Sequence, residues 1–433
     1  MLFEKITLIC DDFTVRDDMY VGVEDDHITY VSEKAPSEGE RTMFGEVYDG
    51  KDKVLMPGFY NGHGHSPMSL LRGYGENLPL DRWLNEKIFP FEAKLTGEAV
   101  YWGTLLSMAE SARFGIVSTS DMYLFNDDMV RAITECGEKS NMCRAVTNFF
   151  GEKPKVNGTI REMKDAVERY NGFDEGRIIV DAGLHAEYTN DTDTAQYVAE
   201  YAISKNLRMH VHVSETEKET RECRERHDGM SPVKYLDKVG IFDVPATAAH
   251  CVWLTDDDRS ILKEKNVTVA SNPISNLKLN SGICEVAKLY RDGINVSIGT
   301  DGASSNNSMD FFEELKTFAL LGKYKGMDAA LMDPAQVLYS ATRAGALSQG
   351  RNDCGLIREG YKADLIVVDF KEPNLQPVHD IRNNLVYAAS GKDVCLTMVD
   401  GRILYMDGEY KTVDIEKIIY NANKSKNDIL KSL

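Results

Sequence analysis

The chain has 433 residues, with 50 Lys and Arg against 69 Asp and Glu, so its formal net charge is −19 at neutral pH. Hydrophobic residues make up 42% and charged residues 27%, a composition that excludes disordered, collagen-like and coiled-coil chains. The negative charge repels phosphate backbones and anionic lipid head groups, which disfavours nucleic acid and membrane surfaces as partners. We therefore expect a globular protein that binds a small neutral or zwitterionic molecule.

The N-terminal stretch Met1 to Asp11 has no apolar run long enough for export or membrane insertion. The eight cysteines are scattered, without a Cys-x-x-Cys pair or a regular spacing, as is typical of reduced thiols. Both features favour a cytoplasmic protein. Internal repeats are absent, which excludes a solenoid or a propeller.

Taken in chain order, the first segment predicts short strands at 6–9, 19–23 and 27–31, separated by turn residues. From Met56 onward, apolar runs alternate with amphipathic helical stretches, as in a succession of βαβ units. The strands expected there are 116–120, 178–182, 207–213, 247–250, 267–271 and 296–299. A helix is expected at 97–114, where Gly115 ends an apolar stripe.

The strand pattern returns near Gly360, at 363–369, 394–399 and 401–405, and a packing helix is expected at 414–433. These strands can complete the sheet that the N-terminal strands begin. We therefore expect residues 1–56 and 360–433 to form one small discontinuous β domain, which includes the last helix. Residues 57–359 would form a continuous α/β barrel.

Several of the nine histidines lie where predicted strands end. His63 and His65 are two residues apart, so on an extended segment both rings point to the same face and can bind one metal ion. His212 has the same relation to His210, and its place nearer the C-terminal end of a barrel strand makes it the better ligand. His210 would lie one layer deeper, as a core histidine. Taken alone, each pair could equally be ordinary loop or core histidines.

Two further strands end in His250 and Asp301, and Glu215 follows His212 by three residues. Singly, His250 could be a structural histidine, Asp301 a turn residue and Glu215 one of several loop carboxylates. Their joint occurrence is the argument, because the ends of successive barrel strands converge on one mouth.

Three neutral imidazoles and one carboxylate suit a single divalent ion such as Zn²⁺ or Fe²⁺. Such an ion lowers the pKa of a bound water toward neutrality, as hydrolysis requires. We expect Asp301 to bind the ion and accept the proton of the water. His250 would orient the hydroxide, and Glu215 would protonate the leaving side of the substrate.

Longer motifs cover nearly the whole chain. They are MPGFYNGHGH at 56–65, LLRG at 70–73, WL at 83–84, IFPFE at 88–92, HVSET at 212–216, AHC at 249–251, SNP at 271–273, SNLKL at 275–279 and GTDGASSNN at 299–307. With these motifs the chain resembles the amidohydrolase superfamily, in particular its branch of S-adenosylhomocysteine and 5′-methylthioadenosine deaminases, neighbours of the triazine hydrolases. The resemblance implies an α/β fold, a distorted (β/α)8 TIM-type barrel with a small β-sandwich formed by both chain termini.

The resemblance also implies a ligand set for one divalent ion, most simply Zn²⁺, with Fe²⁺ or Mn²⁺ as alternatives. That set is His63, His65, His212 and Asp301. Glu215 would shuttle protons and His250 would assist the hydroxide. Homo-oligomers are expected in this family.

Three substrate contacts are implied at matching positions. Glu92 resembles the carboxylate that accepts the ribose hydroxyls, His185 the imidazole that contacts the purine, and Arg144 an arginine that reaches the substrate tail. The alternatives are a helix-start acid for Glu92, a core ring for His185 and a surface charge for Arg144. Arg161 is a candidate for a second arginine at the tail.

The chain departs from the family pattern at three positions. Gly64 stands where threonine is usual, Glu187 where proline is usual, and Ser271 where histidine commonly precedes Asn-Pro. None of these changes removes an expected metal ligand. Glu187 is expected to add a negative charge near the pocket.

The sequence thus predicts a metal-dependent aminohydrolase that converts a 5′-substituted adenosine, such as S-adenosylhomocysteine, 5′-methylthioadenosine, 5′-deoxyadenosine or adenosine itself, to the inosine derivative and ammonia. One alternative is an amino- or chlorohydrolase of a triazine, pyrimidine or free base, although Glu92 would then have no ribose diol to bind. A second is an inactive scaffold protein, which the complete ligand set argues against. A nucleic-acid deaminase would need a basic surface.

Overall fold

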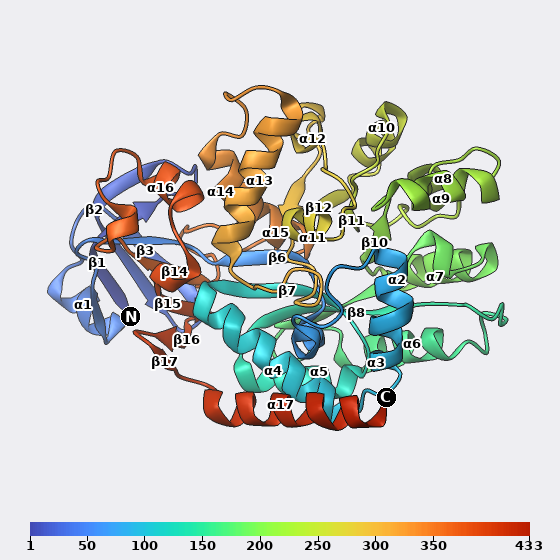
Figure 1. Ribbon diagram of the computed structural model, residues 1–433. Helices are drawn as coiled ribbons and strands as arrows, with labels where there is room; N and C mark the ends of the chain where they lie inside the picture. The colour runs from blue at the N-terminus through green and yellow to red at the C-terminus, as the bar shows by residue number, and fades with distance from the viewer.

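The computed structural model describes residues 1–433, which form a parallel barrel, a second sheet beside it and the helices around both (Figure 1). The barrel sheet has eight strands in the order β13-β12-β11-β10-β9-β8-β7-β6. They are β6 (Phe59–Gly64), β7 (Ile116–Met122), β8 (Lys139–Val146), β9 (Ile178–Leu184), β10 (Met209–Val213), β11 (Ala246–His250), β12 (Thr268–Ser271) and β13 (Val296–Ile298). Because all neighbouring pairs are parallel, the expected α/β barrel is confirmed.

Helices connect these strands and cover the outside of the barrel (Figure 1). They are α4 (Gly97–Phe114), α5 (Asn126–Cys136), α6 (Gly158–Tyr170), α7 (Thr192–Lys205), α8 (Glu217–Arg226), α9 (Pro232–Lys238), α10 (Asp256–Glu264), α11 (Pro273–Lys278), α12 (Val286–Asp292), α13 (Phe311–Gly326), α14 (Pro334–Ala341) and α15 (Arg343–Ser348). The segment between β6 and α4 adds η1 (Ser66–Leu71), α2 (Leu80–Trp83), η2 (Leu84–Ile88) and α3 (Phe89–Glu92). The expected helix at 97–114 is therefore confirmed.

Strand β8 was not among the predicted strands. Its first half, Lys139-Ser140-Asn141, is polar, so a search for apolar runs does not find it, yet every residue of β8 is buried. The Nζ atom of Lys139 lies 2.5 Å from Oδ2 of Asp364 and 2.6 Å from Oδ1 of Asp400. The burial of this charge depends on partners distant in sequence, which a local pattern cannot reveal.

Strands from both chain ends form the second sheet, in the order β17-β16-β15-β14-β5-β1-β2-β3 with β4 beside β1. They are β1 (Leu2–Ile9), β2 (Val15–Glu24), β3 (His27–Ser32), β4 (Val47–Asp49), β5 (Lys53–Pro57), β14 (Leu365–Asp369), β15 (Val394–Val399), β16 (Arg402–Met406) and β17 (Glu409–Tyr410), and α1 (Glu38–Phe44) lies between β3 and β4. A Cβ added to Gly401, in the β15–β16 turn, would lie 1.8 Å from the carbonyl oxygen of Asp25, in the β2–β3 turn. The sheet therefore folds back on itself around its own apolar core, and the expected small β domain built from both termini is confirmed.

The last helices leave this sheet and pack on the barrel. Helix α16 (Ile381–Tyr387) lies against α13 and α14, and α17 (Ile415–Ser432) runs along α4, where Ile418, Ala422 and Ile429 are buried (Figure 1). The expected C-terminal helix is confirmed, while the division into 1–56 with 360–433 and 57–359 stays a prediction. None of the helices combines the length and apolarity needed to cross a membrane.

The barrel closes through a narrow seam between β6 and β13. One bridge pairs Gly64 with Asp301, and the Asp301 N–H donates to the carbonyl oxygen of His63 at 3.0 Å. A Cβ added to Gly299 would lie 2.9 Å from both the nitrogen and the carbonyl oxygen of His63. Only glycine allows the two backbones to approach this closely.

The Gly299→Ala variant is expected to unfold with a free energy lower by about 1–3 kcal/mol, because the added methyl group overpacks the seam. The movement would also separate His63 from Asp301 and lower the amount of metal bound per chain. Thermal unfolding and elemental analysis measure both effects. Gly158→Ala, in a helix with open space around it, is the matched control and should lower neither.

Candidate active site

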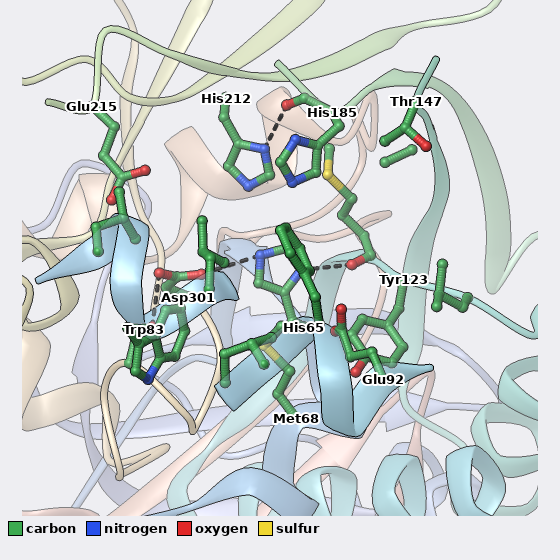
Figure 2. A pocket seen from close by; sticks show the side chains of 18 of the residues that line it. His65, Met68, Trp83, Glu92, Tyr123, Thr147, His185, His212, Glu215 and Asp301 are labelled. Atoms are coloured by element: carbon green, nitrogen blue, oxygen red, sulfur yellow. Dashed lines mark hydrogen bonds and ion pairs between the residues drawn. The ribbon is translucent and has the colours of Figure 1, made fainter. Parts of the chain in front are cut away.

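Four side chains expected to bind a metal ion converge at the C-terminal mouth of the barrel. The nitrogen atoms of His63, His65 and His212 that can serve as ligands lie within 4.8 Å of one another. Oδ1 of Asp301 is 3.2 Å from Nε2 of His65 and 3.6 Å from Nε2 of His63. Figure 2 shows His65, His212 and Asp301 turned toward the same space. Residues from three distant parts of the chain thus form one compact donor set.

The outer nitrogen of each ring is held by a further group. The Nδ1 contacts are Met122 O for His65 at 2.5 Å, His185 O for His212 at 2.6 Å, and His210 Nε2 for His63 at 2.9 Å. A hydrogen on Nδ1 leaves the lone pair of Nε2 directed at the common centre, as metal-binding histidines require. Nε2 of His63 is buried and has no hydrogen-bond partner within the protein. This donor set fits a divalent ion of the zinc type.

The opposing charges in the cluster favour an ionised Asp301. Burial raises its pKa, but the close contacts of its carboxylate with the rings of His63 and His65 outweigh burial and hold the pKa well below its usual range. The same contact raises the pKa of His65 to about 9, although burial lowers it. The second oxygen, Oδ2 of Asp301, accepts from Ser275 Oγ at 2.5 Å and Ser305 Oγ at 2.9 Å. A cation that binds here would therefore displace a proton.

His250 and Glu215 lie beside this donor set. The ring centroid of His250 is 5.4 Å from that of His63, and Nδ1 of His250 is 2.8 Å from Oδ1 of Asn276. Nε2 of His250 is 3.8 Å from Oε2 of Glu215. His250 and Asp301 both have left-handed backbone, with φ of 72° and 59°. Such strain in non-glycine residues is concentrated at functional sites.

Glu215 is almost fully buried, with 7% of its surface exposed. It is thus not the solvated loop carboxylate that its charged neighbourhood in the sequence suggests. Burial raises its pKa, and Ser281 Oγ donates to Oε1 at 3.1 Å. A carboxyl group with a raised pKa retains its proton nearer to neutral pH and can act as a general acid.

A second glutamate, Glu219, which the sequence did not single out, holds the backbone of this turn. Its Oε1 accepts from the N–H of Ser214 at 2.9 Å, and its Oε2 accepts from the N–H of Glu215 at 2.7 Å. Ser214 has a φ of 51°, so consecutive N–H groups converge on the carboxylate as in an anion-binding nest. Burial, followed by repulsion from Glu215, raises the pKa of Glu219 to about 7. The sequence feature that could have indicated this role is the spacing from Thr216 to Glu219, which is typical of a capping box at the start of a helix.

The donor set faces a cavity of about 340 Å³ whose lining is mostly apolar. Glu92, His185 and Arg144 all line it, as expected for substrate contacts, and Figure 2 shows Glu92 beside Tyr123. Burial raises the pKa of Glu92. Burial likewise lowers the pKa of His185 to about 4, which leaves its ring neutral at physiological pH. Arg144 is not a surface charge, because its side chain is 9% exposed.

The structure corrects two expectations about this region. Glu187 does not line the cavity; its buried carboxylate pairs with Arg226 and His227, each at 2.6 Å. Its charge is therefore neutralised away from the site. Arg161 is exposed on α6 and does not line the cavity either. His210 is buried, as expected of a core histidine, and its Nε2 contacts Nδ1 of His63.

Comparison with known proteins agrees with this geometry. The family model described as "Amidohydrolase family" matches residues 54–404. The chain belongs to the amidohydrolase family. A relative from Dictyoglomus thermophilum, named 5-methylthioadenosine/S-adenosylhomocysteine deaminase, is 40% identical over 431 residues, covering 100% of this chain and 99% of the relative.

Two other matches have related names. A 5′-deoxyadenosine deaminase from Methanosarcina mazei is 40% identical over 410 residues, covering 95% of this chain and 93% of the relative. The crystal structure of an adenosine deaminase from Xanthomonas campestris with bound zinc has a TM-score of 0.92 and 30% identity, covering 99% of this chain and 98% of that one.

Replacing a proposed ligand should remove the metal and leave the fold intact. His212→Ala is expected to lower zinc affinity by more than the roughly 10–100-fold that loss of an outer partner costs. Glu92→Ala should retain zinc, because Glu92 lies outside the donor set. Zinc content after dialysis against a chelator measures this, and the exposed His379→Ala is the control. Full zinc retention in His212→Ala would contradict the ligand assignment.

Proposed function

We propose that this amidohydrolase deaminates the adenine ring of 5′-substituted adenosines and releases the inosine derivative and ammonia. The observation that carries the proposal is a buried carboxyl group, that of Glu215, which lines the same cavity as His65, His212 and Asp301 of the donor set. The names of relatives at 40% identity over nearly the full chain support the choice of substrate.

We propose Zn²⁺ as the resident ion, held by His63, His65, His212 and Asp301. The zinc-containing structure at 30% identity supports this choice. When bound, the ion supplies a water molecule of lowered pKa at neutral pH. The remaining chemistry belongs to the side chains around it.

Proton movement is assigned to three residues. Asp301 accepts the proton that the water loses as it attacks C6 of the purine, and His250 orients that water. Glu215, whose pKa is raised by burial, donates its proton to N1, then takes the proton of the hydroxyl group formed at C6 and passes it to the departing amine, so that ammonia leaves. The proton that Asp301 accepted from the water then returns Glu215 to its acid form. The purine thereby exchanges its amino group for an oxygen.

Substrate position is assigned to residues of the cavity wall. Glu92 would accept the two ribose hydroxyls, and the neutral ring of His185 would contact the purine. These contacts accelerate the reaction by orientation, because a displaced ring loses rate steeply. The carboxyl group of Glu92 in the cavity wall also favours a nucleoside over a triazine or a free base, since neither offers a diol to satisfy it.

A substrate panel tests the proposal. Ammonia release by the zinc-loaded protein should be seen with 5′-deoxyadenosine or 5′-methylthioadenosine and not with guanine, cytosine or melamine. Glu215→Gln should lower the rate by about 100-fold or more, because general acid catalysis is lost. Activity on a free base or triazine alone would mean that the substrate assignment is wrong.

The carboxylate of Glu219 should act on the rate through Glu215. Glu219→Gln keeps the shape but replaces one acceptor by an amide group that faces an N–H, so the turn shifts. We expect kcat to fall by about 10–100-fold, with unchanged KM and zinc content. The control is Glu225→Gln, an exposed position on the same helix. An unchanged kcat in Glu219→Gln would show that the turn is held by other contacts.

A further inference from the structure

The cavity that contains the proposed site continues outward into a wider mouth of about 740 Å³. Phe89, Phe149 and Tyr188 line both the cavity and the mouth. The rings of Phe89 and Phe149 meet edge to face with centroids 6.4 Å apart, and Phe149 is 60% exposed. A group that passes from the cavity to solvent therefore crosses an aromatic neck, and an apolar group there covers exposed apolar surface.

Three lysine and arginine side chains line the cavity and the mouth: Arg144, Lys218 and Lys278. Each already has a carboxylate partner. The pairs are Arg144 Nε with Glu162 Oε2 at 2.7 Å, Lys218 Nζ with Asp81 Oδ2 at 3.1 Å, and Lys278 Nζ with Glu76 Oε1 at 2.8 Å. The lining therefore has no lysine or arginine whose charge is unpaired.

Of the three pairs, the one between Arg144 and Glu162 lies nearest the proposed reacting groups, and Arg144 is the least exposed of the three cations. Besides its contact with Glu162, Arg144 donates from Nη1 to the carbonyl oxygen of Ala145 at 2.5 Å. Glu162 lies on α6 with 58% of its side chain exposed, and it contacts Arg144 without lining the cavity or the mouth itself. An anionic group that approached Arg144 would meet the charge of Glu162 and compete for the same guanidinium.

The orientation of a nucleoside in the site connects these contacts to its 5′ substituent. If C6 reacts at the donor set and the ribose lies at Glu92, the 5′ carbon is at the end of the molecule that faces the mouth. A methylthio group or a hydrogen at this carbon meets the aromatic neck without needing a charged partner. The amino acid tail of S-adenosylhomocysteine carries a carboxylate that does need one.

Resting on the proposed function, we infer that this site selects 5′ substituents without a carboxylate over the amino acid tail of S-adenosylhomocysteine, and that Glu162 is the residue that sets this preference. Glu162 does so by neutralising Arg144, which is the one arginine of the inner cavity, where no lysine is present. Removing the charge of Glu162 would leave Arg144 free to bind a tail carboxylate.

The test is kcat/KM of the zinc-loaded protein for 5′-methylthioadenosine and for S-adenosylhomocysteine. In the unmodified chain the first should exceed the second by about tenfold or more, the size expected for one unmade charged hydrogen bond. In Glu162→Gln the ratio should fall several-fold, through a gain on S-adenosylhomocysteine. Glu168→Gln, an exposed glutamate on the same helix, is the matched control and should keep the ratio.

Two results would overturn the inference: equal use of both nucleosides by the unmodified chain, or an unchanged ratio in Glu162→Gln. Because Glu162 is half exposed, its variant should fold, and a thermal unfolding curve verifies this. Glu162→Ala provides a second variant with the same expectation. Absence of turnover on every nucleoside would instead refute the proposed function, so the two failures are distinguishable.

Discussion

The closure of the barrel between its first and last strands is the constraint on which the site depends. At this seam the Asp301 N–H donates to the carbonyl oxygen of His63, and glycine at position 299 lets the backbones meet. The same two residues bring their side chains into the donor set. Each side of the seam supplies one member of the donor set. If β13 moved away from β6, the geometry of the proposed metal site would therefore be lost as well. We therefore expect the stability of the seam and the affinity of the proposed metal site to be coupled.

Around this seam, carboxyl groups in one cavity are held in different states. The pKa of Asp301 lies well below its usual range, because the rings of His63 and His65 lie against its carboxylate, while burial raises the pKa of Glu215. Opposite shifts in neighbouring carboxyl groups separate the base from the acid at a single pH. Glu219 contributes differently, through the main chain, by fixing where the Glu215 side chain begins. The polar residues of the cavity thus divide into those proposed to contact the substrate and those that hold such residues in place.

Much of the site followed from strand ends. His63, His65, His212, His250 and Asp301 each sit at the end of an apolar run, and parallel strands in a barrel bring such ends together. The prediction could be made without coordinates, because the barrel topology alone places these strand ends close together. Strand β8 was not predicted, because its first three residues are polar although they are buried. The buried charge of Lys139 is stabilised by Asp364 and Asp400, which come from another part of the chain. The expected effect of Glu187 was wrong for the same reason, because its partners Arg226 and His227 lie about forty residues away.

The sequence by itself determined the alternation of strands and helices, the order of the strands and the residue types at their ends, because these depend on local periodicity and on the chemistry of each side chain. Only the tertiary structure decided which charges are free and which are neutralised. The sequence does not show whether Glu162 accepts a hydrogen bond from Arg144. Nor does it distinguish Glu219, which holds the backbone of its turn, from the other acidic residues of a charged run. Such pairings depend on distances between segments that only the folded chain brings together, and these distances set the electrostatics of the cavity.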